Sequence, residues 1–229
     1  MKYRVANAVS ACELIIISSF IFLFGAPVLA DTVNVSASAW GSARDVGRDG
    51  SFESISFSSS IVLQRLPNAN VADRGLWEFD LSELPSGAIT RIELELIVVS
   101  TSLDRANFDL YGYAGNGTIE PSDAAGGTLL AANLNGNVIS QSPPIFVDVT
   151  SFIQDPAIQA AGFAGFYARY PNEVGDTVLQ KQLQDPGANF GNASPWLVVE
   201  LAPVPIPAAA WLFGSGLIGL FGFARHNKQ

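Results

Sequence analysis

The sequence predicts an all-β protein, an antiparallel β-sandwich or jelly roll, flanked by two apolar terminal segments. Three observations support this prediction. Between residues 31 and 203, apolar and polar residues alternate with a period of two, which is typical of half-buried strands. Turn signals rich in Gly, Pro and Asn separate the alternating stretches. Residues 14–29 and 208–224, in contrast, contain no charged residue.

Residues 1–30 have the features of a secretory signal peptide. Two cations near the start precede a ten-residue apolar stretch, LIIISSFIFL (14–23). Val and Ala then stand at positions −3 and −1 of a cleavage site between Ala30 and Asp31. We therefore expect export of the chain and removal of this segment. A retained membrane helix is the alternative.

Eight alternating stretches divide the middle region, 31–203, into short strands. About eight to ten such strands suit a sandwich or a jelly roll. A short helical turn is expected over 151–154, with Thr150 as its cap and Pro156 as its stop. The predicted strands are 32–39, 75–81, 91–98, 108–113, 145–149, 163–170, 177–183 and 197–201.

The composition of the middle region excludes several functions. It holds eight Lys and Arg against twenty Asp and Glu, a net charge of −12, so it lacks the basic face that nucleic acid requires. The only His, His226, and the only Cys, Cys12, lie outside it. A Ser-His-Asp or Cys-His nucleophile and a His/Cys zinc site are therefore absent from this region. We expect no cofactor and no enzymatic activity.

Paired carboxylates leave one enzymatic alternative open. Glu78 with Asp80, and Glu93 with Glu95, are i, i+2 pairs, so each pair shares one strand face at a spacing of about 7 Å. Glycoside hydrolases place two carboxylates about 5 to 9.5 Å apart. The same pattern describes a solvated strand face, which is the simpler interpretation. A secreted glycan-acting hydrolase is kept as the alternative.

Two further residue pairs are candidates for ligand binding. DVGRDGS (45–51) places Asp45 and Asp49 in a Gly-rich loop, an arrangement of oxygen ligands that suits Ca²⁺; a plain polar turn is the alternative. Tyr111 and Tyr113 fall opposite the apolar register of their strand. Exposed tyrosine rings stack on sugar rings, whereas packing on the sheet surface is the alternative.

The C-terminal segment, 204–229, predicts one transmembrane helix. Its apolar stretch, AAAWLFGSGLIGLFGFA (208–224), spans roughly 26 Å as a helix, at the low end for a hydrocarbon core of about 30 Å. Trp211 suits a membrane interface, and Arg225 and Lys228 are expected to stay cytoplasmic, which places the middle region outside. A buried core helix, the alternative, would show a polar face.

This segment resembles the PEP-CTERM protein-sorting signal in its VPLPA-type variant. The resemblance rests on a Pro-rich tetrad, the string AAAWLFGSG, a Gly-rich apolar helix and a basic end, which follow one another in that order. Ile206 replaces the Leu of the variant, and the Glu of the general form is missing. The tetrad consists of Val204, Pro205, Ile206 and Pro207.

The resemblance implies a partner and a location. An exosortase, a membrane-embedded Cys transpeptidase-like enzyme, would cleave near the tetrad and release or re-anchor the middle domain at the cell surface. The implied host is a Gram-negative bacterium that makes exopolysaccharide and biofilm. The protein would pass through the inner membrane, held by 208–224, before it reaches the surface or the extracellular matrix. A permanently anchored envelope protein, whose tail is never cut, is the alternative.

The middle region is also similar to DNRLRE-type β-sandwich domains. The similarity is carried by 74–81, 84–85, 88–94, 147–150 and 195–199, whereas 31–73 does not match the opening of that family. Such domains resemble carbohydrate-binding modules of secreted or surface proteins. The similarity therefore implies a non-enzymatic domain with a structural role or weak carbohydrate binding, with exopolysaccharide as one partner.

Overall fold

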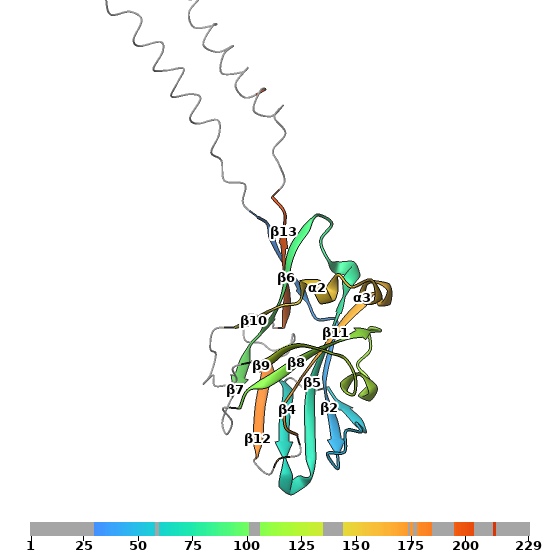
Figure 1. Cartoon of the computed structure of the whole chain (residues 1–229), viewed down its shortest axis with the longest axis vertical. Coiled ribbons are helices and arrows are strands. Elements are labelled where there is room, and N and C mark those ends of the chain that lie inside the picture. Colours follow the sequence, from blue (N-terminus) through green and yellow to red (C-terminus); the bar gives the residue numbers. More distant parts are fainter. Residues whose placement is uncertain are drawn as a thin grey trace, which may run out of the picture. The chain divides into compact units, whose positions relative to one another are not determined.

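The computed structural model describes residues 30–57, 60–100, 106–134, 144–173, 175, 178–184, 195–203 and 213. Within it, Asp31–Ala202 forms one compact unit (Figure 1). Apart from Ala30 and Phe213, the predicted signal peptide, the tetrad, the 208–224 helix and the basic end lie outside the described residues. No helix in the described part of the chain has the length and apolar character that crossing a membrane requires.

The compact unit is built mainly of β-strands, joined in antiparallel pairs. Two sheets pack against each other, which confirms the predicted all-β antiparallel class. The strands are β1 (Thr32–Ser36), β2 (Ala39–Val46), β3 (Ser54–Ser56), β4 (Ser60–Leu66), β5 (Val71–Asp80), β6 (Ile89–Leu96), β7 (Val98–Ser100), β8 (Phe108–Gly115), β9 (Thr128–Leu134), β10 (Ile145–Asp148), β11 (Phe163–Arg169), β12 (Leu179–Gln184) and β13 (Trp196–Leu201).

The small sheet has the strand order β1-β13-β6-β10, and the large sheet has the order β7-β12-β4-β5-β11-β8-β9. Strand β5 also pairs with β2, which in turn pairs with β3. Along its other edge, β5 pairs first with β4 and then with β11. The first and last strands of the unit, β1 and β13, are neighbours, so its two ends lie side by side.

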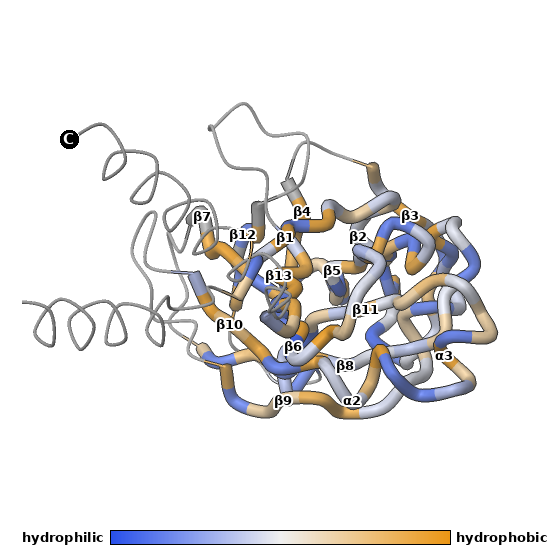
Figure 2. The backbone as a smooth tube through the Cα atoms, turned by 90° about the horizontal axis from the view of Figure 1, so that it is seen from above, coloured by the Kyte–Doolittle hydropathy of each residue, from blue (hydrophilic) through white to orange (hydrophobic). Residues whose placement is uncertain are grey.

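The main core lies between the two sheets, on the apolar face that the alternation predicts. Figure 2 shows this alternation as orange and blue segments along the strands. Phe166 packs edge-on against Phe79, with 5.7 Å between the ring centroids, and at 5.4 Å against Phe152. The largest fully buried side chains of the unit include Trp77, Phe79, Phe108, Phe166, Ile61, Leu63, Ile92, Leu94 and Leu96.

The large sheet is covered on its outer face as well. A second cluster of buried apolar residues forms there around Leu76 and Tyr167, together with Ala43, Ile119 and Ala124. The β2–β3 hairpin supplies partly buried side chains to this cluster. The chain between β8 and β9 supplies buried ones, through residues in and before the 3₁₀ helix η3 (Pro121–Ala124). The outer face is therefore interior over part of its area.

Two short helices replace the single helical turn predicted after residue 150. The first, α2 (Thr150–Ile153), contains Thr150, and its N-cap is Val149. Thr150 as a cap is thus wrong, because its hydroxyl instead bonds the backbone of Ile92 on β6. Pro156 begins the second helix, α3 (Pro156–Ala161), because its missing N–H and fixed φ suit the first turn of a helix.

Four strands arise where the alternation predicts none, namely β2, β3, β4 and β9. In β2 the residues at several inward positions are small, so they give no apolar alternation. The strand predicted at 177–183 is observed as β12, Leu179–Gln184. The other predicted strands lie within two or three residues of observed ones, although β5 extends further towards the N-terminus.

Candidate functional site

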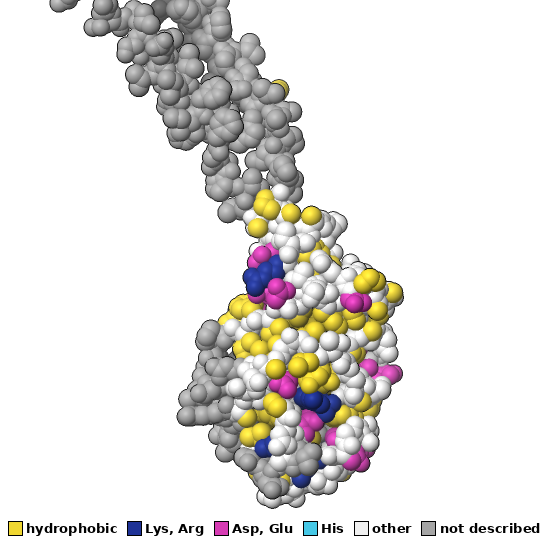
Figure 3. Space-filling view, in the orientation of Figure 1, with side chains coloured by type: hydrophobic (Ala, Val, Ile, Leu, Met, Phe, Trp, Pro, Cys, Tyr) yellow, Lys and Arg dark blue, Asp and Glu magenta, His cyan; other side chains and the backbone are white. Residues whose placement is uncertain are grey.

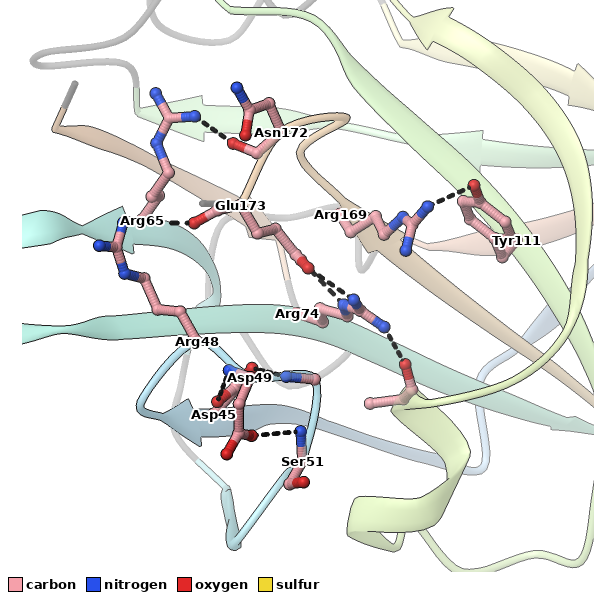
Figure 4. Close-up of polar contacts among 12 residues, drawn as sticks. Asp45, Arg48, Asp49, Ser51, Arg65, Arg74, Tyr111, Arg169, Asn172 and Glu173 are labelled. Carbon is pink, nitrogen blue, oxygen red and sulfur yellow. Dashed lines mark hydrogen bonds and ion pairs between the residues drawn. The ribbon is translucent and has the colours of Figure 1, made fainter. Parts of the chain in front are cut away.

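Tyr111 and Tyr113 lie on the outer face of the large sheet, opposite the core residues of β8. Tyr111 stacks on Tyr167 of β11, with ring centroids 5.0 Å apart and planes 1° from parallel. Arg169 lies 4.5 Å from the centre of the Tyr111 ring and donates a hydrogen bond of 2.7 Å to its hydroxyl (Figure 4). The Tyr113 ring covers Gly165, where a Cβ atom would lie 2.3 Å from it. Both rings are thus partly used in packing.

A buried ion pair stands next to these tyrosines. Arg74 donates from Nε and Nη2 to the two carboxylate oxygens of Glu173, at 2.8 and 2.5 Å, and its Nη1 donates to the carbonyl of Ala124 (Figure 4). Its guanidinium lies 4.6 Å from the Phe52 ring centre and 5.5 Å from that of Tyr167. The Arg74 and Glu173 side chains are 6% and 14% exposed. The pair therefore ties β5 to the segment after β11.

Glu78, a member of one predicted carboxylate pair, is fully buried. Its Oε2 accepts hydrogen bonds from the N–H groups of Gly117, at 2.6 Å, and Asn116, at 3.3 Å. The carboxylate lies directly over Gly115, where a Cβ atom would be 2.7 Å from it. Its Oε1 and the nearby hydroxyl of Tyr113 have no hydrogen-bond partner in the described structure. The solvated-face interpretation is therefore wrong for Glu78.

The surroundings of Glu78 raise the pKa of its carboxyl group. Burial raises its pKa, the N–H of Gly117 opposes this rise, and the negative charge of Asp123 adds to it. Burial also raises the pKa of Tyr113, and the charge of Glu78 raises it further. Such a carboxyl could donate or accept a proton, but it is enclosed by the β8–β9 segment. It has no solvent-exposed surface through which a substrate could reach it.

The predicted carboxylate pairs do not form a shared site. Asp80 lies at the end of β5, where its carboxylate accepts the N–H of Ser82 and caps a 3₁₀ turn. Glu93 and Glu95 lie on the small sheet, at half-buried positions. Glu93 forms an ion pair of 2.6 Å with Arg91. The Asp80 contact stabilises the end of β5, and the Glu93 ion pair lies on the surface of the small sheet. In the described structure, no substrate cleft lies between the two members of either carboxylate pair.

Asp45 and Asp49 do come together, and Glu53 joins them. One carboxylate oxygen from each of the three lies within 4.8 Å of those of the others. Asp45 is buried at the end of β2 and accepts the N–H groups of Asp49 and Gly50, whereas Asp49 accepts that of Ser51 (Figure 4). Three carboxylates suit Ca²⁺ in chemistry. The same groups also hold the hairpin turn without an ion.

Glu53 is not part of the predicted pair, whereas Arg48 lies inside the predicted loop 45–51. Glu53 joins the carboxylate cluster because the β2–β3 hairpin brings it next to β2. There its carboxylate accepts the N–H of Val46 at 2.7 Å. Arg48, inside the loop, turns away from the carboxylates and donates to the side chain of Asn70 and to the carbonyl of Gly175. The Gly residues of 45–51 are enough to predict a hairpin turn. They do not indicate on which side of the hairpin the Arg48 side chain lies.

The visible surface of the unit carries few cations. Figure 3 shows dark blue side chains in small groups on this face, most of them beside magenta acidic ones. Of the described pairs, Arg91 contacts both Glu93 and Asp148. This distribution agrees with the composition, because it offers no extended basic area on this face for a nucleic-acid backbone.

The predicted processing sites border the compact unit. Asp31, the residue after the predicted signal cleavage, accepts the N–H of Leu201 at 2.9 Å. Ala202 donates its N–H to the carbonyl of Ala88 at 2.7 Å. The unit therefore ends two residues before Val204, the first residue of the tetrad, which lies outside the described structure together with Trp211, Arg225 and Lys228.

A scan of protein-family models and a search of curated proteins each find no match to the chain.

Proposed function

We propose that the protein is an exported, non-enzymatic surface or extracellular-matrix protein whose C-terminal segment is a sorting signal. An exosortase-type enzyme would recognise the tetrad 204–207, with the 208–224 helix holding the chain in the inner membrane and the basic end facing the cytoplasm. The segment 1–30 would direct export as a signal peptide. The order of tetrad, apolar stretch and basic end carries this proposal.

The bounds of the compact unit support the proposal. Strand β1 begins at Thr32, one residue after the predicted signal cleavage, and β13 ends at Leu201, three residues before the tetrad. Cleavage at either place would leave every described strand of the unit intact. The hydrogen bonds that close the unit, from Leu201 to Asp31 and from Ala202 to Ala88, lie inside both cleavage points. A folded domain bounded in this way is suited to be released or transferred as a whole.

A non-enzymatic role is favoured because the candidate acidic groups are buried or engaged in structural contacts. Glu78 is enclosed, Asp80 caps a turn, and the Arg74–Glu173 pair is buried between segments. These groups stabilise the two-sheet unit, which we expect to be a sandwich of the jelly-roll kind. Its own role would be structural, with weak carbohydrate binding. The hydrolase alternative would require an accessible pair of carboxylates.

The sorting signal can be tested with paired proline substitutions in the native host. Pro205→Ala with Pro207→Ala should leave the uncleaved protein in the inner membrane, because the tetrad is changed while the apolar helix is kept. Pro203→Ala, one residue outside the tetrad, is the matched control and should sort normally. Fractionation and immunoblotting give the readout. Normal sorting of the double variant would contradict the proposal and favour a permanently anchored protein.

A further inference from the structure

A solvent-open cavity of about 410 Å³ lies at one end of the large sheet, where β4, β9, β12, the residues just before β8 and the segment after β11 meet. This volume falls within the usual range for small-ligand sites, about 300–1,000 Å³. Its lining residues are Arg65, Ala106, Asn107, Asn133, Tyr170, Pro171, Asn172 and Leu179.

The lining combines amides with apolar surface and contains no acidic side chain. Three of its eight residues are asparagines, and one is an arginine, in a domain whose net charge is −12. Each asparagine amide carries both donors and an acceptor, which matches hydroxyl groups that can also do both. Pro171, which is exposed, and Leu179, which is half-buried, supply apolar surface for C–H groups. This is the chemistry of a polyhydroxylated ligand.

A β-bulge in β9 sets the direction of one of these amide side chains, that of Asn133. Between the pairs Phe108–Leu134 and Leu110–Ala131, β9 has one more residue than β8, and Asn133 in this bulge has a φ of 56°. Asp109 holds the bulge by accepting the N–H of Asn133 at 2.9 Å. Bulges of this kind redirect a side chain, often beside a functional site. The side chains of Asn133 and Asn107 have no hydrogen-bond partner within the described structure.

The opposite wall of the cavity is fixed by Arg65. This residue is buried in β4 and donates from Nη1 to the carbonyl of Asn172 (Figure 4). The bond ties β4 to the segment after β11, which carries Tyr170 and Asn172 into the lining. The cavity is therefore framed by paired strands on one side and by an arginine-held segment on the other.

We propose that this cavity binds a neutral sugar residue of a polysaccharide. The exposed amides of Asn107 and Asn133 would bond its hydroxyl groups, and Pro171 and Leu179 would contact its C–H groups. A neutral sugar is favoured over an acidic one because the guanidinium of Arg65 is engaged by a carbonyl and the domain as a whole repels anions. The proposal deepens the carbohydrate-binding part of the proposed function and rests on it, but it is independent of the sorting signal.

Binding can be measured on the purified full chain, ¹⁵N-labelled, in a detergent without a sugar headgroup. The probes are cellohexaose and maltohexaose as neutral oligosaccharides, and hexagalacturonate as the acidic one. We expect a neutral probe to shift the side-chain NH₂ signals of Asn107 and Asn133, with a Kd in the millimolar range. Asn133→Gly keeps the positive φ and removes the amide.

Asn133→Gly and Asn107→Ala should each weaken binding by roughly threefold to tenfold, as expected for one lost hydrogen bond. Asn34→Ala, an exposed asparagine on β1 of the small sheet, is the control and should bind like the unchanged chain. Three results would overturn the inference: no shifts with either neutral probe, shifts with hexagalacturonate alone, or shifts centred on Tyr111. Because binding is measured on purified protein, its failure would leave the sorting result unaffected, and the reverse also holds.

Discussion

The inner face of the large sheet and the covered part of its outer face are buried by different means. The inner face meets the small sheet through apolar side chains such as Trp77, Phe79 and Phe166. The outer face meets a hairpin and the β8–β9 segment, and it buries Arg74, Glu78 and Tyr167 beside a smaller apolar cluster. Alternation along a strand separates two faces correctly, but it does not tell which of them meets water.

This difference assigns separate roles to the two faces. Apolar contacts on the inner face hold the sheets together and tolerate no large void. The outer face is held by hydrogen bonds and one ion pair, whose loss leaves a buried group without a partner. The inner face should therefore respond to side-chain volume, and the outer face to charge and pH.

A substitution on the inner face is expected to lower the free energy of unfolding the most. Phe166→Ala should lower the free energy of unfolding by about 3–5 kcal/mol, because it opens a cavity between Phe79 and Phe152. Phe57→Ala is the matched control, since Phe57 is 71% exposed and should change stability by less than about 0.5 kcal/mol. Urea unfolding followed by Trp fluorescence measures both. Equal effects would show that the core has been placed wrongly.

On the outer face, Arg74→Ala should cost about 3–5 kcal/mol, because it leaves Glu173 poorly solvated and uncompensated. Arg91→Ala breaks an ion pair whose arginine is 46% exposed and should cost less than about 1 kcal/mol. Replacing both partners, by Arg74→Met with Glu173→Leu, should recover much of the loss. If the two single variants were equally mild, the Arg74–Glu173 pair would not be buried.

Glu78 offers a pH test of the same face. Glu78→Ala removes the acceptor of two N–H groups and should cost about 1–3 kcal/mol. Folding raises the pKa of Glu78 above its ordinary 4.5, so the folded protein binds the proton more tightly than the unfolded chain. Its contribution to stability is therefore full at low pH and declines as the pH rises through the folded pKa.

Glu78→Gln keeps an acceptor for these N–H groups and cannot ionise. The Tm difference between this variant and the unchanged chain should shift in favour of the variant as the pH rises from about 4.5. Melting curves across pH measure it. A difference that moves the opposite way would mean that the ionised carboxylate is stabilised by its surroundings.

The smallest effects are expected in the carboxylate cluster. Asp45→Ala should cost about 1–2 kcal/mol, because two N–H groups lose a buried acceptor. Asp49→Ala, at an exposed position, should change stability by less than about 0.5 kcal/mol. We expect added Ca²⁺ to leave the Tm of the unchanged chain the same. A Ca²⁺-dependent rise that Asp49→Ala removes would instead identify a cation site.

Much of the fold follows from the sequence, but less of the site does. The apolar alternation of β6, β8, β11 and β13 places their core residues, because a period of two fixes which side chains share a face. Strand β4 is not among the predicted strands, although its apolar residues Ile61 and Leu63 are two positions apart. Strand β2 carries small residues inward, and β9 has no such alternation, so neither gives a strong signal.

The buried ion pair and the lining of the cavity depend on contacts between segments that are distant in the sequence. Glu173 pairs with Arg74 across 99 residues, and Asn107, Asn133 and Asn172 meet only because β8, β9 and the end of β11 converge. Alternation identifies the face of a residue but not its partner. The enclosure of Glu78 by Gly115 and Gly117 is equally invisible in the sequence, because it depends on the path of the β8–β9 segment.

We propose that the folded domain is separated from its C-terminal segment during sorting. Mass spectrometry of the C-terminal peptide of the surface or extracellular form tests it most directly. We expect a terminus between Val204 and Pro207, with the 208–224 stretch and the basic end absent. A surface form that still carries Lys228 would contradict it.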